Sequence, residues 1–323
     1  MQQNQPKIEL YRKRTFTQKL TDTFGFLREN WKPLTKYFIY IMLPLSIVTA
    51  FFANHFFNGY FSIIGAFESA GTFNDDQLIK FVLSTLAASV VGLLAYLVLI
   101  GLVYAMVRLY HLREDRLKNL SWAELKPDLW HCIKRSLWMT LAGLLILLVI
   151  IGIFVVVCWG LFSIDKILGF LGIVFLYVLA LAIVLPMSLA APAYMLEDDL
   201  GVFSAYLKGM RLGFATWGGV LAVTFVVGII TGVVQSFTML PWYVLSLAKM
   251  LVTVANKQEG GFFNTSLFDF IQYLTCILSC LGYFVSAVIT IIGITIQYGH
   301  ACDKIDGVGV ARNIEKFDEF DNL

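Results

Sequence analysis

The stretch from Pro186 to Trp217, PMSLAAPAYMLEDDLGVFSAYLKGMRLGFATW, decides how this chain is organised. An apolar run precedes it, the acidic turn EDDL lies near its middle, and an amphipathic segment then leads to a tryptophan at the start of the next apolar run. This order is typical of a chain that leaves a membrane, follows its surface and enters it again. Weaker versions of the same passage occur on either side, so we take it as the repeating element of the fold.

The composition is that of a membrane protein. Of the 323 residues, 59% are hydrophobic and 14% are charged, whereas a soluble protein is roughly half apolar and about a quarter charged. Several apolar runs are long enough to cross a hydrocarbon layer of about 30 Å as helices. We therefore expect an all-α, polytopic membrane protein with six spans. The expected spans are residues 37–57, 78–108, 136–162, 168–190, 217–240 and 267–299.

We expect a single integral membrane domain over residues 1–323. Residues 1–36 would form a cytoplasmic arm, residues 37–299 would carry the six spans, and residues 300–323 would form a cytoplasmic tail. Residues 241–256, PWYVLSLAKMLVTVAN, are apolar enough to bury but too short and polar to span. We expect them to form a separate helix in the outer interface.

Two segments besides the 186–217 stretch have the periodicity of a helix that lies on a membrane. Their apolar residues recur at steps of three and four, which places them on one helix face. These residues are Phe16, Leu20, Phe24 and Leu27 in the first segment and Trp122, Leu125, Leu129, Ile133 and Leu137 in the second. Ser121 and Glu124 have the spacing of a capping box at the start of the second segment.

The distribution of Lys and Arg predicts the orientation. Twenty of the 24 lie in the arm, in the loop after the second span, in the 186–217 stretch or in the tail. The other four are Lys80, Lys166, Lys249 and Lys257. Because cytoplasmic loops carry the excess of Lys and Arg, both termini should be cytoplasmic. We expect a multi-pass protein of a bacterial cytoplasmic (inner) membrane.

The spans repeat in pairs. Each odd-numbered span is preceded by an amphipathic helix and entered near a tryptophan, and each even-numbered span ends in a tyrosine followed five residues later by an aspartate. The tryptophans are Trp31, Trp138 and Trp217, and the pairs are Tyr110 and Asp115, Tyr194 and Asp199, and Tyr298 and Asp303. We expect three parallel hairpin repeats, each preceded by a cytoplasmic amphipathic helix. Chance is the alternative, since Trp and Tyr are common at membrane interfaces.

The segment APAYMLEDDLGVFSAYLKGMRLGFATW also carries a family signature. Its marked positions are Pro192, Glu197, Gly201, Ala205, Lys208, Leu212 and Trp217. They resemble the signature of a bacterial family of six-helix membrane proteins related to the membrane domain of glycerophosphodiester phosphodiesterases. This chain has Gly209 where the family usually has Ser. The resemblance covers about 30 residues and implies the membrane fold, but not the phosphodiesterase activity, because the sequence contains no soluble phosphodiesterase domain.

Three acidic residues, Glu197, Asp198 and Asp199, lie where the amphipathic helix of the 186–217 stretch should begin. The structural interpretation is that they cap this helix and interact favourably with its dipole. The functional interpretation is a cytoplasmic acidic site that shares a rim with Asp115 and Asp303.

Basic residues near the expected membrane entries are candidates for contacts with anionic lipid headgroups, at about 1 kcal/mol each. The alternative is that they only set the topology. The candidates are Lys19, Arg28, Lys32, Lys134, Arg135, Lys208 and Arg211.

No motif for catalysis, a metal or a cofactor is evident. Some His and Cys residues lie near the cytoplasmic entries, but they come from distant segments without close ligand spacing. They are His131, Cys132, His300 and Cys302. Cys276 and Cys280 share a helix face and are better explained as small packing residues than as ligands. No expected span carries a central ionisable residue, which argues against coupled transport.

We therefore expect a non-enzymatic integral membrane protein that binds or organises lipid or a membrane partner. Its expected partners are anionic lipids, with another membrane protein or a second copy of the chain as a further partner, and no nucleic acid or cofactor. The first alternative is a channel or uncoupled transporter for a small solute, with residues 241–256 as a lid. The second is a membrane enzyme with a cytoplasmic cavity lined by Glu197, Asp199 and His131.

Overall fold

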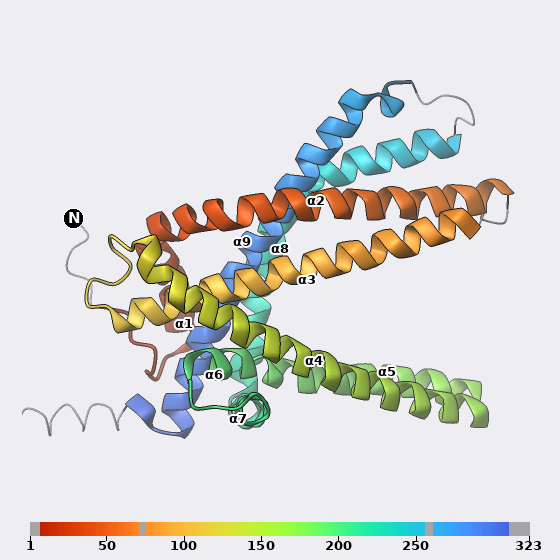
Figure 1. The fold of residues 1–323 in the computed structure, drawn as a ribbon. Helices are drawn as coiled ribbons and strands as arrows, with labels where there is room; N and C mark the ends of the chain where they lie inside the picture. Colours follow the sequence, from red (N-terminus) through yellow and green to blue (C-terminus); the bar gives the residue numbers. More distant parts are fainter. Residues whose placement is uncertain (1–6, 71–74, 256–260, 310–323) are drawn as a thin grey trace, which may run out of the picture. The chain divides into compact units, whose positions relative to one another are not determined.

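A computed structural model describes residues 7–70, 75–255 and 261–309 of the chain (Figure 1). All regular structure in these residues is helical, which confirms the all-α prediction. The elements in chain order are α1 (Phe16–Glu29), α2 (Trp31–Ala70), α3 (Asp75–Leu112), α4 (Trp122–Ile164), α5 (Lys166–Met187), α6 (Ala190–Leu196), α7 (Val202–Ala215), α8 (Trp217–Ala255), the 3-10 turn η1 (Gly261–Asn264) and α9 (Ser266–Ile305). The part of the tail after residue 309 lies outside the described residues.

Six stretches in the described residues are long and apolar enough to cross a membrane, as expected. They are Trp31–Phe61, Leu78–Leu112, Trp122–Ile164, Lys166–Leu196, Trp217–Val252 and Ser266–Ile305. All are longer than the sequence predicted. The longest has 43 residues, which corresponds to about 65 Å at 1.5 Å per residue, roughly twice the thickness of a hydrocarbon core. Part of each such helix must therefore lie beyond the hydrocarbon.

The division of residues 121–162 into a surface helix and a separate span is wrong. Both belong to α4, which runs without interruption from Trp122 to Ile164. The predicted capping box at its start is confirmed, because the Ser121 side chain accepts from the Glu124 backbone N–H and the Glu124 side chain accepts from that of Ser121. Residues 128–142 contain neither Gly nor Pro, so the helical hydrogen bonds continue where the polarity changes.

The separate interfacial helix expected at residues 241–256 is also wrong. Helix α8 continues through Pro241 and ends at Ala255. A proline inside a helix removes one backbone hydrogen bond, but helices in apolar surroundings tolerate this where neighbouring groups compensate. Residues 241–255 are therefore a continuation of the preceding span, and their length on its own did not decide how they fold.

The described chain forms two compact units. The first contains residues 7–30, 100–227 and 290–309, and thus α1, α4 to α7 and one end each of α3, α8 and α9. Its largest fully buried side chains include Tyr104, Tyr110 and Tyr298. The second contains residues 31–70, 75–99, 228–255 and 261–289. Its core includes Ala50, Trp242 and Cys276.

Within the first unit, α4 and α5 form an antiparallel hairpin (Figure 1). In the most apolar part of each helix, only 6% of the residues are buried. Leu148, Val156 and Phe175 are each 66% or 67% exposed. Helices that are apolar on every side are typical of membrane spans, where hydrocarbon rather than water surrounds the side chains.

Helix α7 packs closely on the end of α5 and on α6 through glycine. A Cβ atom added to Gly209 would lie 2.6 Å from Ala190 Cα, and one added to Gly213 would lie 2.6 Å from Pro186 Cα. Both neighbouring atoms belong to the backbone, so neither can move aside alone. The short helix α6, which the sequence analysis did not predict, is held in this contact.

We predict that Gly209→Ala lowers the free energy of unfolding by about 1–3 kcal/mol, as overpacking typically does. The matched control is Gly218→Ala, because a Cβ atom at Gly218 meets nothing within 4 Å. The midpoint of thermal unfolding of the purified protein measures both changes. A midpoint in Gly209→Ala no lower than in Gly218→Ala would show that the two backbones are not in close contact.

Candidate functional site

The candidate site is the acidic loop, Glu197–Leu200, which joins α6 to α7 in the first unit. The expected capping of α7 by these carboxylates is wrong. Gly201 is the N-cap residue and makes no side-chain bond, and the first turn of α7 contains no acidic residue. Since α7 begins only at Val202, the carboxylates remain in the loop and are available to other partners.

Asp198 forms the centre of the loop's contacts. Arg108 of α3 donates to both carboxylate oxygens, over 2.7 and 2.8 Å. The Nε2 atom of His131, in α4, lies 3.1 Å from Asp198 Oδ1. The hydrogen bonds from Arg108, followed by the one with His131, lower the pKa of Asp198 to about 2. The carboxylate is therefore ionised at any physiological pH.

Arg135 of α4 holds the backbone of the loop. Its guanidinium donates to the carbonyl oxygens of Tyr194 at 3.0 Å, Glu197 at 2.8 Å and Asp198 at 3.1 Å. It also lies 4.0 Å from the centre of the Tyr194 ring. Carbonyls at the end of a helix lack helical partners. A rigid cation with five donors is well suited to bind several of them at once.

Glu197 joins the loop to two further helices. Lys208 of α7 donates to both of its carboxylate oxygens over 2.7 Å. The hydroxyl of Tyr298, a fully buried residue of α9, donates to Glu197 Oε1. The loop is thus bonded to α3, α4, α7 and α9, and its two inner carboxylates are paired with cations.

The structure does not gather the other predicted acidic residues at this loop. Asp199 is exposed and has no hydrogen-bond or ion-pair partner among the described residues. Asp115 is exposed in the turns after α3. Asp303 is buried in α9 and accepts from the Gly309 N–H at 2.9 Å. No hydrogen bond or ion pair in the described chain joins Asp115 or Asp303 to the acidic loop.

Three of the predicted lipid-binding cations are engaged inside the protein. Arg135 and Lys208 bind the acidic loop. Lys19, expected to contact lipid headgroups, is instead only 5% exposed. Removal from water, together with the charges of Lys304 and Arg14, lowers the pKa of Lys19 to about 8. These three side chains therefore make contacts inside the protein and are not placed to contact lipid.

The other four predicted cations remain at the surface. Arg28, Lys32 and Lys134 are exposed. The Lys32 ammonium lies 5.9 Å from the centre of the Trp31 ring, and that of Lys134 lies 5.6 Å from the ring of Trp130. Trp31 and Trp130 are 58% and 60% exposed. The fourth is Arg211, whose side chain is 58% exposed although it binds Asp306.

Helix α7 turns its small residues and Leu212 inward and three other large apolar residues outward. Ala205, Gly209, Leu212 and Gly213 are its buried residues. Phe203 is 63% exposed, Leu207 69% and Phe214 49%. This is the reverse of a surface helix in a water-soluble protein, whose large apolar residues face the core.

Helix α1 also buries residues outside its predicted apolar stripe. Its inward residues are Lys19, Thr23 and Phe26. The apolar stripe predicted from the sequence lies elsewhere on the helix, and its first residue, Phe16, is 40% exposed. The other three stripe residues, Leu20, Phe24 and Leu27, are half-buried.

The loop's chemistry is that of a structural junction. Among the described residues no group of three or more His, Cys, Asp or Glu side chains is placed to hold a metal ion. The partner that the sequence analysis missed is Arg108. A signal was present, since Arg108 is the first charged residue after a long apolar run and such residues usually have a partner. The identity of that partner could not be read from the sequence.

The six apolar spans and these outward apolar faces identify the chain as a multi-pass membrane protein. Comparisons with protein-family models, curated proteins and solved structures give no match to this chain.

We predict that Asp198→Asn destabilises the protein at neutral pH by about 1 kcal/mol, a modest value because half of the carboxylate surface is exposed and screened. The folded-state pKa of about 2 is below the ordinary value of 3.8. The stabilisation is therefore complete above pH 4 and is lost as the pH falls towards 2. Thermal unfolding measured between pH 7 and pH 3 should show the gap from the unmodified protein narrowing below pH 4.

The control for this experiment is Asp199→Asn, which removes the same charge one residue further along the exposed loop. It should leave the unfolding midpoint unchanged. Equal losses in the two variants would mean that the net charge, and not the contact with Arg108, is responsible.

Proposed function

We propose that this chain is a non-enzymatic integral membrane protein that binds anionic lipid at its cytoplasmic surface and organises the lipid there. The observation that carries the proposal is the outward face of α7, with Phe203, Leu207 and Phe214 exposed. Large apolar side chains exposed on a helix that follows the end of a span are suited to insertion between headgroups and acyl chains. The exposed Phe16 at the start of α1 supports the same role.

The exposed pairs of lysine and tryptophan support a preference for anionic lipid. Tryptophan favours the membrane–water interface, and a lysine beside it can reach the headgroups. Lys32 beside Trp31 and Lys134 beside Trp130 have this arrangement. Both lysines belong to the basic segments that the distribution of Lys and Arg assigns to the cytoplasm.

The non-enzymatic part of the proposal is supported by the acidic loop. Glu197 and Asp198 are both bound by cations, which leaves neither of them as a free acid or base. His131 is bound to the same loop.

Three parallel hairpin repeats are also part of the proposal, and three equivalent contacts support them. In each expected repeat the tyrosine at the end of the second span contacts a charged residue in or next to the repeat's own surface helix. The three contacts are Tyr110 Oη to Glu29 at 3.2 Å, the Tyr194 ring to Arg135 at 4.0 Å, and Tyr298 Oη to Glu197. Because these contacts recur in all three expected repeats and were not part of the sequence pattern, they favour a common structural unit over a chance alignment.

We further propose that the chain belongs to the bacterial six-helix family that its 191–217 segment resembles, in the cytoplasmic membrane with both termini inside. The close approach of Gly209 to Ala190 gives a physical reason for the glycine where the family usually has serine. A serine there would collide with the backbone of α6.

We predict that the double variant Lys32→Glu, Lys134→Glu loses the preference for phosphatidylglycerol over phosphatidylcholine. The expected loss is about tenfold or more, since each lysine contributes about 1 kcal/mol at an anionic surface. Native mass spectrometry of protein purified from a mixture of the two lipids counts the molecules retained.

The matched control is Lys80→Glu with Lys166→Glu. These lysines are also exposed but are expected on the outer side and have no neighbouring tryptophan in the sequence. This control should keep the preference. An equal loss in both double variants would show that only the net charge matters, and an unmodified protein without any preference would overturn the proposal.

The orientation has its own test. A membrane-impermeant maleimide added to intact cells should label Asp75→Cys and leave Trp130→Cys unlabelled, because the positive-inside rule places residue 130 in the cytoplasm. Both positions are exposed in the folded chain. Labelling of residue 130 alone would reverse the topology.

A further inference from the structure

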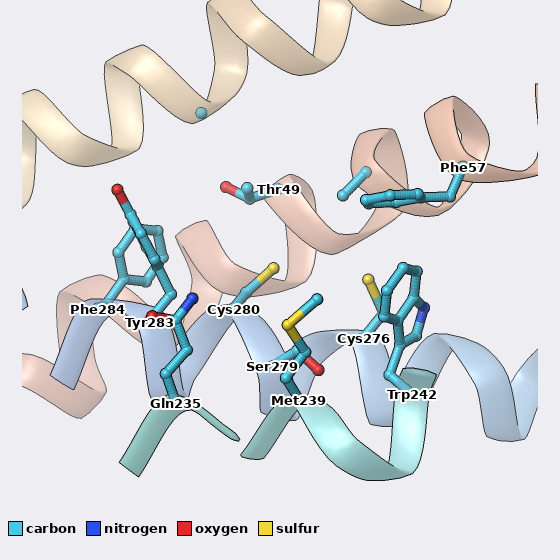
Figure 2. A pocket seen from close by; sticks show the side chains of 12 residues that line it. Thr49, Phe57, Gln235, Met239, Trp242, Cys276, Ser279, Cys280, Tyr283 and Phe284 are labelled. Carbon is cyan, nitrogen blue, oxygen red and sulfur yellow. The ribbon is translucent and has the colours of Figure 1, made fainter. Parts of the chain in front are cut away.

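The second unit contains a pocket between its own helices. Residues of α2, α3, α8 and α9 line it, and its cavity volume is about 190 Å³. Figure 2 shows Thr49 and Phe57 on one side and Gln235, Met239, Trp242 and residues of α9 on the other. The twelve lining residues include no Asp, Glu, Lys, Arg or His.

Two polar groups of the lining donate to the backbone, whereas Thr49 Oγ1 and Trp242 Nε1 are buried without a hydrogen-bond partner among the described residues. The Ser279 hydroxyl donates to the carbonyl oxygens of Thr275 at 2.9 Å and Thr238 at 3.2 Å. The Cys276 thiol donates to the Ala50 carbonyl at 3.6 Å. Almost all of the exposed pocket surface is nevertheless carbon and sulfur, and it offers little to a polar solute.

The pocket belongs to the membrane-spanning part of its unit. All of its lining residues lie inside candidate spans, with Thr49 and Gly92 near the middle of theirs. An apolar cavity of about 150 Å³ remains free of water and accepts a molecule the size of benzene. A pocket of this size and chemistry, surrounded by bilayer hydrocarbon, is suited to part of a hydrocarbon chain.

We propose that this pocket binds one aliphatic chain of a membrane lipid. Phe57, Trp242 and Phe284 provide rigid apolar walls. Met239 contributes a flexible thioether that adapts to a chain of variable shape. The site rests on the proposed function in taking a lipid as its ligand. The pocket proposal goes further because it names the part of the lipid that is bound. Binding of an aliphatic chain does not depend on the charge of the headgroup.

The test is a variant that fills the pocket. A Cβ atom at Gly92 meets nothing within 4 Å, and Gly92 lines the pocket, so Gly92→Phe would occupy it. Gly152→Phe is the matched control, because Gly152 is also helical with open space at its Cβ position but is not part of the lining. In neutral phosphatidylcholine, native mass spectrometry should show that Gly92→Phe loses the most strongly retained lipid and that Gly152→Phe keeps it.

A second measurement uses the unmodified protein and does not depend on the folding of a variant. Cys280 lines the pocket and is only partly buried. Its alkylation by N-ethylmaleimide, followed by peptide mass spectrometry, should be slowed by phosphatidylcholine after delipidation. An alkylation rate independent of lipid, or slowed by a small polar solute instead, would overturn the proposal. So would equal lipid retention in the two glycine variants.

The two lipid proposals can fail separately. The chain-binding pocket predicts protection of Cys280 in neutral lipid whether or not Lys32 and Lys134 are present. Loss of anionic preference in the lysine variant with full protection of Cys280 would support both proposals. Anionic preference in a protein whose Cys280 is never protected would leave only the surface site.

Discussion

The ion pair between Arg108 and Asp198 is the contact on which the arrangement of the first unit depends. Its two residues lie 90 positions apart, and it fixes the turn between α6 and α7 to the end of α3. Arg135 completes this junction by binding carbonyls that the end of α6 leaves without helical partners. Removing water from a charge is costly unless it is paired, and the largely buried Arg108 is paired with Asp198.

Once the loop is fixed, glycine determines which side of α7 faces the protein. The absence of a side chain at Gly209 and Gly213 lets the backbone of α7 approach Ala190 and Pro186. Small residues at a helix interface are a common means of close packing among membrane helices. Since the small residues and Leu212 face inward, Phe203, Leu207 and Phe214 are left on the outside. The close packing of α7 on α6 and the end of α5 therefore also determines which residues form the surface proposed to bind lipid.

The two units use polar groups differently. The first buries Lys19, Arg14 and Tyr298 and connects its helices through carboxylates and guanidinium groups. The second encloses a pocket whose walls are apolar, with Trp242 almost fully buried. Charge pairing gives directional contacts at the loops. Within hydrocarbon, helices associate mainly through the packing of apolar and small side chains.

The sequence alone determined the helical class, the six apolar spans and the capping box at Ser121, because these depend on hydropathy and on residues close in the chain. Only the tertiary structure decided that α4 is continuous and that α6 exists. It also decided that Lys19 and Arg135 face inward while Lys134 stays exposed. A basic residue has the same local pattern whether it meets a lipid or a carboxylate 60 positions away. The partner is selected by the packing of distant helices, and no local pattern records that selection.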